Sequence, residues 1–357
     1  MASLDELNPR EKEILNQLSL GLSDQAIADR LFLSLNTIKW YNRQIYSKLG
    51  VRTRTQAIAR AQEIGILNKA EAPRIKRGEQ KVHFTNSFDG ARIAYAIAGK
   101  GPTLVKAANY LDHLSFAWDS PVWGHWLEEL TSKHTLIRYD ERGTGMSDRN
   151  ASDLSFQAWV SDLEAVVNAA GLDRFSLFAM SQACAAAVAF AARHPERVNR
   201  LVLYGGYARG WLNRDLTSEQ KAEEKLLMRI MRVGWGQENP AFRRVFATQL
   251  FPEATTEELH ALEEQMFLSA SPENAVRLES EMHRVDVRQL AIKVQVPTLI
   301  FHSRQDGAVP FEEGVLLASL IPGAQFVPLE SKNHLLTEEE PAWKQFQETF
   351  RKFLPPD

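Results

Sequence analysis

The spacing of hydrophobic positions divides the chain into two parts. Over residues 1–67 hydrophobic side chains recur every three or four positions, the period of short amphipathic α-helices. The first predicted helix follows Asn8-Pro9-Arg10-Glu11, the second covers 24–31 behind Ser23, and the third covers 35–49 between Ser34 and Gly50. About three residues separate the second helix from the third, as in a helix-turn-helix. The predicted core of this part is Leu7, Ile14, Ala26, Ile38 and Leu49.

Strand patterns begin at residue 82, after a stretch over 68–81 that loses periodicity and is predicted to be a linker. Two alternating runs flank Asp89-Gly90, a hairpin signal. Apolar runs then alternate with helical stretches, which favours an α/β domain with a mostly parallel sheet. Strands are predicted over 103–109, 134–140, 174–180, 200–206, 298–303 and 324–330, and helices over 159–171 and 182–195. Residues 207–296 are predicted to form an inserted helical lid over the strand ends.

The distribution of charge indicates a nucleic-acid contact, although the 357 residues carry a net charge of only −3. Between Asp29 and Glu63 there is no acidic residue, whereas the basic residues are Arg30, Lys39, Arg43, Lys48, Arg52, Arg54 and Arg60. A local basic face favours a DNA-binding module, and a solvated helix face is the alternative interpretation. The third helix also carries side chains of the types that reach phosphates and base edges in a major groove.

Cysteine content and hydropathy favour a cytoplasmic location. Cys184 is the single cysteine, so no disulfide can form within the chain, and this fits a reducing compartment. The polar start of the sequence is unlike a signal peptide. The longest apolar run, 183–192, is far shorter than the roughly 20 residues of a membrane-spanning helix.

The sequence LNPREKEIL…GLSDQAIADRLFLSLNTIKWYNRQIYSKLGVRTRTQAI resembles the LuxR-type DNA-binding domain over nearly its full length. The expected DNA contacts are Lys39, Arg43 and Lys48, with Thr37 and Trp40 as weaker candidates. Packing of Trp40 against the first helix is the alternative interpretation. The resemblance implies a homodimer on two operator half-sites and RNA polymerase as a further partner. A helical interaction module that does not bind DNA is the competing hypothesis. Such domains more often end a protein than begin it, which is a departure from the usual arrangement.

Three residues of the second part lie where a nucleophile, an acid and a base are needed. Ser181 stands between a predicted strand and a predicted helix in A-M-S-Q-A, where a sharp turn would expose its hydroxyl group. Asp306 and His334 each follow a later strand. A serine hydroxyl needs a base within reach and a carboxylate that orients the base. The chain order Ser, Asp, His is that of α/β-hydrolases.

Four segments, NYLDHLSFAWDSPVWGHWLEEL, IRYDERGTGMSD, RHPERVNRLVLYGGYARG and PLESKNHLL, resemble one group of α/β-hydrolase-fold domains. In that group the domain is fused to helix-turn-helix or other signalling domains. The resemblance covers residues 82–357 and implies that Ser181 is the nucleophile, Asp306 the orienting acid and His334 the base. It assigns the oxyanion donors to backbone N–H groups of Gln182 and of a residue in Asn109-Tyr110.

The chain departs from that pattern at its small residues. Ala179 and Ala183 replace both glycines of G-x-S-x-G, and Ala108-Asn109 replaces the His-Gly of the oxyanion loop. Either the added methyl groups are accommodated or they force the strained turn open. Loss of one oxyanion donor costs about 100- to 1000-fold in rate. These departures favour a pocket kept for binding rather than for turnover.

Other residues near the predicted site have less specific roles. The residues that either line the pocket or pack the loop are Tyr110, His113, Trp118 and Trp123. Arg142 is expected to tie loops together, and Cys184 to be a small buried hydrophobe. The histidines lack ligand-like spacing and no nucleotide-binding glycine loop occurs, so neither a metal nor a cofactor is predicted.

Three functional hypotheses are open. The leading one is a DNA-binding transcription regulator that senses a small apolar molecule bearing a carbonyl or hydroxyl group, held by Ser181 and His334 beneath the lid. The second is an active serine hydrolase that turns over its own inducer, an ester, lactone or thioester. The third is a constitutive DNA-binding protein whose hydrolase-like domain only dimerises.

Overall fold

The computed structural model of the chain contains two compact units, Met1–Arg74 and Ile75–Asp357. It describes residues 7–19, 24, 27–28, 31, 33–51, 53–64, 66, 80–237 and 239–355. The predicted linker over 68–81 therefore lies almost wholly outside the described residues, as does most of the predicted second helix over 24–31, with Ser23 and Ala26. No helix in the described part of the chain has both the length and the hydropathy needed to cross a membrane.

The first unit is helical, and its described helices are α1 (Pro9–Ser19), α3 (Leu35–Leu49) and α4 (Arg54–Glu63). At the start of α1, Asn8 and Glu11 exchange two hydrogen bonds between their side chains and backbone N–H groups, both 2.8 Å long. This capping box satisfies N–H groups that a helix start leaves free. Ser34 caps α3 by accepting from the Thr37 N–H, and Gly50 ends α3 with φ 68°. The predicted core residues Leu7, Ile14, Ile38 and Leu49 are all buried.

The second unit contains one eight-stranded sheet in the order β1-β2-β4-β3-β5-β6-β7-β8. Its strands are β1 (Lys81–Asn86), β2 (Arg92–Gly99), β3 (Thr103–Lys106), β4 (Thr135–Tyr139), β5 (Phe175–Met180), β6 (Val198–Tyr204), β7 (Thr298–Ser303) and β8 (Gln325–Leu329). The pairs β1·β2 and β2·β4 are antiparallel, and the other pairs are parallel. This arrangement confirms the predicted mostly parallel sheet.

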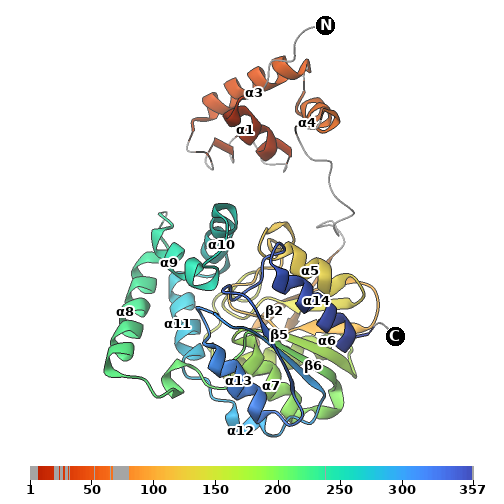
Figure 1. Cartoon of the computed structure of the whole chain (residues 1–357), viewed down its shortest axis with the longest axis vertical. Helices are drawn as coiled ribbons and strands as arrows, with labels where there is room; N and C mark the ends of the chain where they lie inside the picture. The colour runs from red at the N-terminus through yellow and green to blue at the C-terminus, as the bar shows by residue number, and fades with distance from the viewer. Residues whose placement is uncertain are drawn as a thin grey trace. The chain divides into compact units, whose positions relative to one another are not determined.

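The helices of this unit cover both faces of the sheet (Figure 1). They are α5 (Gly124–Thr131), α6 (Phe156–Ala169), α7 (Ala183–Arg193), α8 (Ser218–Gly234), α9 (Ala241–Leu250), α10 (Thr256–Ser269), α11 (Pro272–Met282), α12 (Arg288–Ala291), α13 (Phe311–Leu320) and α14 (Pro341–Phe353). Helices α6, α7, α12 and α13 enclose one hydrophobic core, and α5 and α14 enclose a second. Helices α8 to α11 lie between β6 and β7 in the sequence and form a separate group beside the sheet (Figure 1).

An aromatic cluster fixes α5 and α14 on the second face. The ring centroids of Trp126 and Trp343 are 4.6 Å apart, and those of Trp343 and Phe346 are 5.2 Å apart. All three side chains are buried. Such pairs contribute about 0.5–1.5 kcal/mol each beyond the burial of their area, so the last helix is firmly attached to the sheet that carries the site.

Candidate functional site

Ser181 occupies a tight turn between the end of β5 and the start of α7. Its φ is 53°, which is rare for a residue other than glycine. The Ser181 N–H donates to the carbonyl oxygen of Tyr204, 2.8 Å away, and so ties the turn to β6. Because the strand stops at Met180 and the helix starts at Ala183, the serine lies at the sheet edge formed by the carboxyl ends of the strands. Ligands of open α/β sheets bind at this edge.

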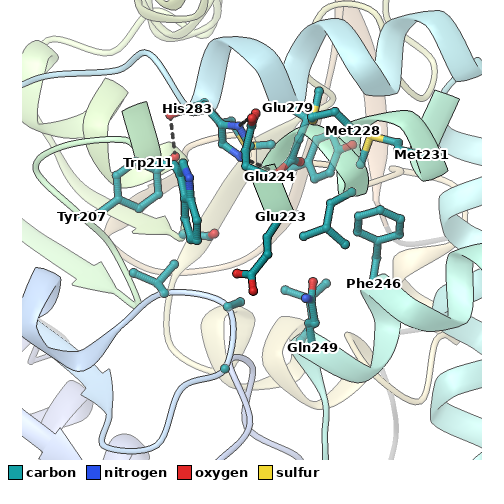
Figure 2. A pocket seen from close by; sticks show the side chains of 18 of the residues that line it. Tyr207, Trp211, Glu223, Glu224, Met228, Met231, Phe246, Gln249, Glu279 and His283 are labelled. Atoms are coloured by element: carbon teal, nitrogen blue, oxygen red, sulfur yellow. Dashed lines mark hydrogen bonds and ion pairs between the residues drawn. The ribbon is translucent and has the colours of Figure 1, made fainter. Parts of the chain in front are cut away.

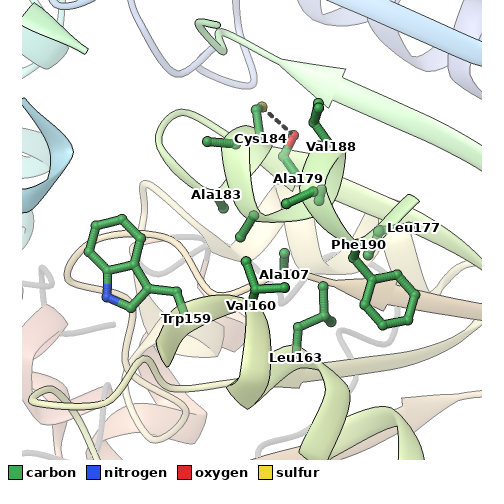
Figure 3. Packing of buried hydrophobic residues seen from close by; sticks show 14 of the residues in the cluster. Ala107, Trp159, Val160, Leu163, Leu177, Ala179, Ala183, Cys184, Val188 and Phe190 are labelled. Atoms are coloured by element: carbon green, nitrogen blue, oxygen red, sulfur yellow. Dashed lines mark hydrogen bonds between the residues drawn. The ribbon is translucent and has the colours of Figure 1, made fainter. Parts of the chain in front are cut away.

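The two alanines that replace glycine are accommodated beside this turn. Ala179 is fully buried and Ala183 is 2% exposed, and both pack with Ala107 and Val160 in the first core (Figure 3). Ser181 keeps its positive φ, so the alanines do not open the elbow in the way that the sequence left possible.

The strict need for glycine lies instead at the end of β6. A Cβ atom at Gly206 would lie 2.5 Å from the Cys184 sulfur, and one at Gly205 would lie 2.9 Å from Cε1 of His334. Gly205 also has φ 58°. Sequence reasoning missed both glycines because the contacts that forbid a side chain there come from distant parts of the chain.

Asp306 and His334 form a buried hydrogen-bonded pair. His334 Nδ1 and Asp306 Oδ2 are 2.6 Å apart, and both side chains are 2% exposed or less. The other carboxylate oxygen of Asp306 accepts from the N–H groups of Ala308 and Val309, each at 2.9 Å. Burial raises the pKa of Asp306, but His334, His302 and the Val309 N–H outweigh it, so the pKa lies below its ordinary value. The pair is therefore arranged to hold the imidazole in one orientation.

The second ring nitrogen of His334, Nε2, is buried and has no hydrogen-bond partner among the described residues. This nitrogen is therefore not committed to another protein group in the described structure. The His334 N–H donates to the carbonyl oxygen of Leu250, the last residue of α9, at 2.7 Å. The candidate base is thus attached directly to the lid.

The strand that the sequence predicts over 103–109 ends at Lys106, although the Ala107 N–H still donates to the carbonyl oxygen of Phe178 in β5 at 2.9 Å. The side chain of Asn109 does not enter the cavity but accepts a hydrogen bond from Lys106, which also pairs with Asp112 at 2.8 Å. Leu111 adopts φ 62°, and its carbonyl oxygen accepts from Gln265 of α10 at 2.9 Å. The side chain of Asn109 therefore has a structural role, and the predicted backbone donor in Asn109-Tyr110 stays a prediction.

Of the remaining loop residues, Tyr110 reaches the cavity and bonds through its hydroxyl group to the Ala275 carbonyl oxygen of α11, 3.1 Å away. His113, Trp118 and Trp123 are buried, but within the described part of the chain none of them lines the cavity. His113 accepts from the Ser115 N–H through Nδ1, and Trp118 donates to Gln80. They pack the loop.

A cavity of about 360 Å³ opens over Ser181 and beneath α8 to α11 (Figure 2). Its lid-side wall is largely apolar and consists of Leu227, Met228, Met231, Trp235, Phe246, Leu250, Met266 and Met282. Polar groups also line it, namely Tyr207, Arg214, Glu223, Glu224, Gln249, Glu279 and His283. Methionine side chains adapt to irregular shapes, so the wall suits a small, mainly apolar molecule whose reactive group lies at Ser181. Sequence patterns do not distinguish these residues from the others in 207–296.

His283 joins two lid helices above this cavity. Its Nδ1 lies 3.0 Å from Glu224 of α8, and its Nε2 lies 3.2 Å from Glu279 of α11 (Figure 2). Burial alone would lower the pKa of His283, but its contacts with Glu279 and Glu224 outweigh burial and raise the pKa above its ordinary value of 6.5. The charged imidazole therefore attaches α8 to α11.

We expect attachment of α8 to weaken as the pH rises. The pKa of His283 is raised on folding, so its stabilising effect is complete below pH 6.5 and is lost as the pH passes the raised pKa. Hydrogen exchange of α8 amides, corrected for the intrinsic pH dependence, should accelerate at least threefold, as expected for a partly buried ion pair of about 1 kcal/mol. Glu224→Gln should abolish most of this change. Equal pH dependence in wild type and variant would refute the role of His283.

The candidate DNA-binding face is the exposed side of α3. Lys39 and Arg43 are exposed, and Trp40 is 50% exposed with its ring edge against Tyr41. Thr37 is half-buried and shares a 2.7 Å hydrogen bond with the hydroxyl group of Ser34. Lys48 differs, because its ammonium group lies 2.7 Å from the buried carboxylate of Glu11. Lys48 therefore holds α3 against α1, and Lys39 and Arg43 are better placed for phosphates.

Comparisons with known proteins agree with the division of the chain into a helical N-terminal unit and an α/β unit. Residues 5–61 match the family described as bacterial regulatory proteins, luxR family, and residues 115–251 match the family described as alpha/beta hydrolase fold. Over 57 residues, 16% of this chain and 26% of the relative, the chain is 46% identical to the CsgBAC operon transcriptional regulatory protein of Escherichia coli.

The second unit is similar to hydrolases over most of its length. The chain is 27% identical to pyrrolizixenacetamide deacetylase of Xenorhabdus hominickii over 268 residues, 74% of this chain and 95% of the relative. The esterase of Exiguobacterium antarcticum shares the fold, with a TM-score of 0.67 and 22% identity over 77% of this chain and 99% of the esterase. This chain thus joins an N-terminal LuxR-type helix-turn-helix domain, of a family whose members bind DNA, to an α/β-hydrolase-fold domain.

Proposed function

We propose that this protein is a DNA-binding transcription regulator that responds to a small acyl compound received at Ser181. The observation that carries the proposal is that the elbow of Ser181 and the Asp306–His334 pair are both kept, beneath a lid that closes a mainly apolar cavity. A ligand in this cavity would contact the lid and the reactive serine together.

The lid offers a physical route from ligand to response. Helix α9 bonds to the backbone of His334, and α11 bonds to Tyr110 of the loop after β3. Adjustment of the lid around a ligand therefore also changes the catalytic loops. For the ligand to alter DNA binding, it must bind one arrangement of the protein more tightly than the other.

Turnover of the same compound is the second candidate function, and the orientation of His334 by Asp306 supports it. His334 Nε2 would take the proton of the Ser181 hydroxyl as its oxygen attacks the acyl carbon. Asp306 would keep the proton on Nδ1, and the N–H groups of Gln182 and of the loop at Tyr110 would stabilise the oxyanion. The bond from the acyl carbon to the alcohol, thiol or amine would then break, and the leaving group would take the proton from His334. Water, deprotonated by His334, would next attack the acylated serine and release the acid, and the proton would return to Ser181. The similarity to a deacetylase and to an esterase is consistent with acyl chemistry.

Labelling with a fluorophosphonate probe tests whether Ser181 is reactive. The serine oxygen forms a bond to phosphorus, fluoride leaves, and His334 accepts the proton. Intact mass should show one adduct on wild type and on Ser319→Ala, a change at an exposed serine of α13, but none on Ser181→Ala. Absence of the adduct from a folded wild-type protein would refute a reactive Ser181 and would leave only ligands that bind without reaction.

The assignment of DNA contacts predicts different results for two basic residues of α3. Arg43→Ala should weaken operator binding and lower the slope of log affinity against log salt by about one, because one phosphate contact is lost. Lys48→Ala should mainly lower the stability of the first unit, since it leaves the Glu11 carboxylate buried without its ion pair. Salt titrations of DNA binding and thermal unfolding of both variants provide the check. A loss of salt slope in Lys48→Ala but not in Arg43→Ala would reverse the assignment.

A further inference from the structure

A buried carboxyl group without a cation lies behind the elbow of Ser181. Glu141, in the loop after β4, is 4% exposed, and its Oε2 atom has no hydrogen-bond partner among the described residues. It lines a small cavity together with Ala108 of the oxyanion loop and Ala183 at the start of α7. Glu141 therefore lies next to both segments that are expected to supply oxyanion donors, the loop after β3 and the turn before α7.

Arg142, the guanidinium group next to Glu141 in the described part of the chain, donates all of its N–H groups to other partners. Arg142 donates from Nε and Nη2 to Asp162, from both Nη atoms to Asp89, and from Nη1 to the carbonyl oxygen of Asp153. These five bonds match the five N–H groups of a guanidinium. Asp89 and Asp162 already share the positive charge of Arg142. A third negative charge beside them is unfavourable, and this favours the neutral form of Glu141.

Gln182 offers a complementary partner to a neutral carboxyl group. Its side chain is 1% exposed and lies beside Glu141, and both of its amide atoms lack a partner with hydrogen-bond geometry in the described structure. A neutral carboxyl group donates through its O–H and accepts through its carbonyl oxygen. A primary amide likewise donates through NH₂ and accepts through its carbonyl oxygen, whereas a carboxylate can only accept. A small adjustment would therefore join the two groups reciprocally if Glu141 carries a proton.

We infer that neutral Glu141 is a positioning residue for the oxyanion site, acting through Gln182, and that loss of its proton slows reaction at Ser181. The inference rests on the proposed reactivity of Ser181. Pairing with Glu141 fixes the peptide of Gln182, whose N–H is the expected oxyanion donor. Ionisation would remove the O–H that donates to the amide oxygen of Gln182, leave a single bond from the amide N–H to the carboxylate, and place a negative charge behind the developing oxyanion. In a medium with an effective dielectric constant of about 20, a unit charge within about 10 Å of a developing oxyanion slows reaction on the order of tenfold.

The surroundings of Glu141 define the pH range of this effect. The titratable groups that face it are Asp162 of α6, Arg142 of its own loop, Tyr139 of β4, Tyr110 of the oxyanion loop and Tyr207 after β6. Burial and then Asp162 raise the pKa of Glu141 to about 8. Burial also raises the pKa of each tyrosine far above its ordinary value, so the tyrosines stay neutral. The two bonds from Arg142 lower the pKa of Asp162, but burial outweighs them, so this pKa lies above its ordinary value.

The test compares the pH dependence of fluorophosphonate labelling in the full-length wild type and in Glu141→Gln. Wild type should lose about tenfold in labelling rate above a midpoint near pH 8, whereas Glu141→Gln, which stays neutral and can still pair with Gln182, should keep its rate. Asp140, whose pKa burial raises to about 7, is present in both proteins, so the difference between the profiles isolates Glu141. Glu164→Gln, a change on the outer side of α6, should follow wild type. The same decline in wild type and Glu141→Gln, or no decline in wild type, would overturn the inference.

A second measurement does not depend on reactivity. The infrared spectrum of wild type minus that of Glu141→Gln at pH 7 should contain the carbonyl band of a neutral carboxyl group, and the band should vanish with a midpoint near pH 8. Absence of this band would overturn the inference even if Ser181 labels normally. Presence of the band in a protein that never labels would refute the proposed reactivity of Ser181 instead, so the two failures are distinguishable.

Discussion

Asp306→Asn is expected to slow fluorophosphonate labelling of Ser181 by about 10,000-fold. The carboxylate accepts the Nδ1–H of His334 at 2.6 Å and leaves Nε2 free to accept the serine proton. An asparagine amide can instead donate to Nδ1, which moves the ring proton to Nε2 and removes the base from Ser181. Stopped-time labelling followed by intact mass measures the rate over this range.

The matched control for this change is Asp286→Asn, an exposed pair with Arg288 on the lid side of the domain. It should label at a rate close to that of wild type. A decrease of less than tenfold for Asp306→Asn would mean that His334 is not oriented by Asp306, and that the neighbouring His302, 3.6 Å from the same carboxylate, needs a new interpretation.

Arg142→Met is expected to lower the free energy of unfolding of the hydrolase-fold domain by about 3–5 kcal/mol. The guanidinium group is fully buried and bonds to the buried carboxylate of Asp162 and to Asp89 in the turn between β1 and β2. Methionine fills a similar volume but leaves both carboxylates without a cation, and a buried uncompensated charge is costly. Urea unfolding of the full chain, followed by the fluorescence of the tryptophans around α5 and α14, reports on this domain.

A second variant separates loss of pairing from loss of packing. Arg142→Met with Asp162→Asn should recover part of the stability, because the buried charge is removed along with its partner. Arg351→Met, at a more exposed pair with Glu129, should cost less than Arg142→Met. A loss below about 1 kcal/mol for Arg142→Met would contradict the assignment of this arginine as the tie between the loops.

The sequence predicts those parts of the structure that local patterns determine. The alternation around Asp89-Gly90 predicts the β1–β2 hairpin, and the apolar runs predict the six later strands, because burial on both faces of a parallel sheet leaves a clear hydrophobic signature. The placement of Ser181 after β5, Asp306 after β7 and His334 after β8 follows from the same patterns, since the carboxyl ends of parallel strands share one edge.

The differences arise where a long-range contact decides. The helix pattern predicts that Lys48 contacts DNA phosphates. Its ammonium group instead pairs with the carboxylate of Glu11, 37 positions earlier in the chain. The side chain of Asn109 could not be placed from the sequence, because its partner is the buried side chain of Lys106. The methyl groups of Ala179 and Ala183 raise doubt about the elbow in the sequence, but the packing of α6 accommodates them. The residues that line the cavity could not be predicted, because the hydrophobic pattern of a lid helix does not identify the helix or strand against which its apolar face packs.

The most direct test of the account measures operator affinity of the full-length protein before and after modification of Ser181. An operator is first selected from random duplex DNA. The protein is then treated with a fluorophosphonate whose alkyl chain fits the apolar cavity, and Ser181→Ala receives the same treatment. A change of at least tenfold in the affinity of wild type, with no change in Ser181→Ala, is the result that the account predicts. Complete labelling of Ser181 with operator affinity unchanged within twofold would contradict it, because occupancy of the cavity would then have no effect on DNA binding.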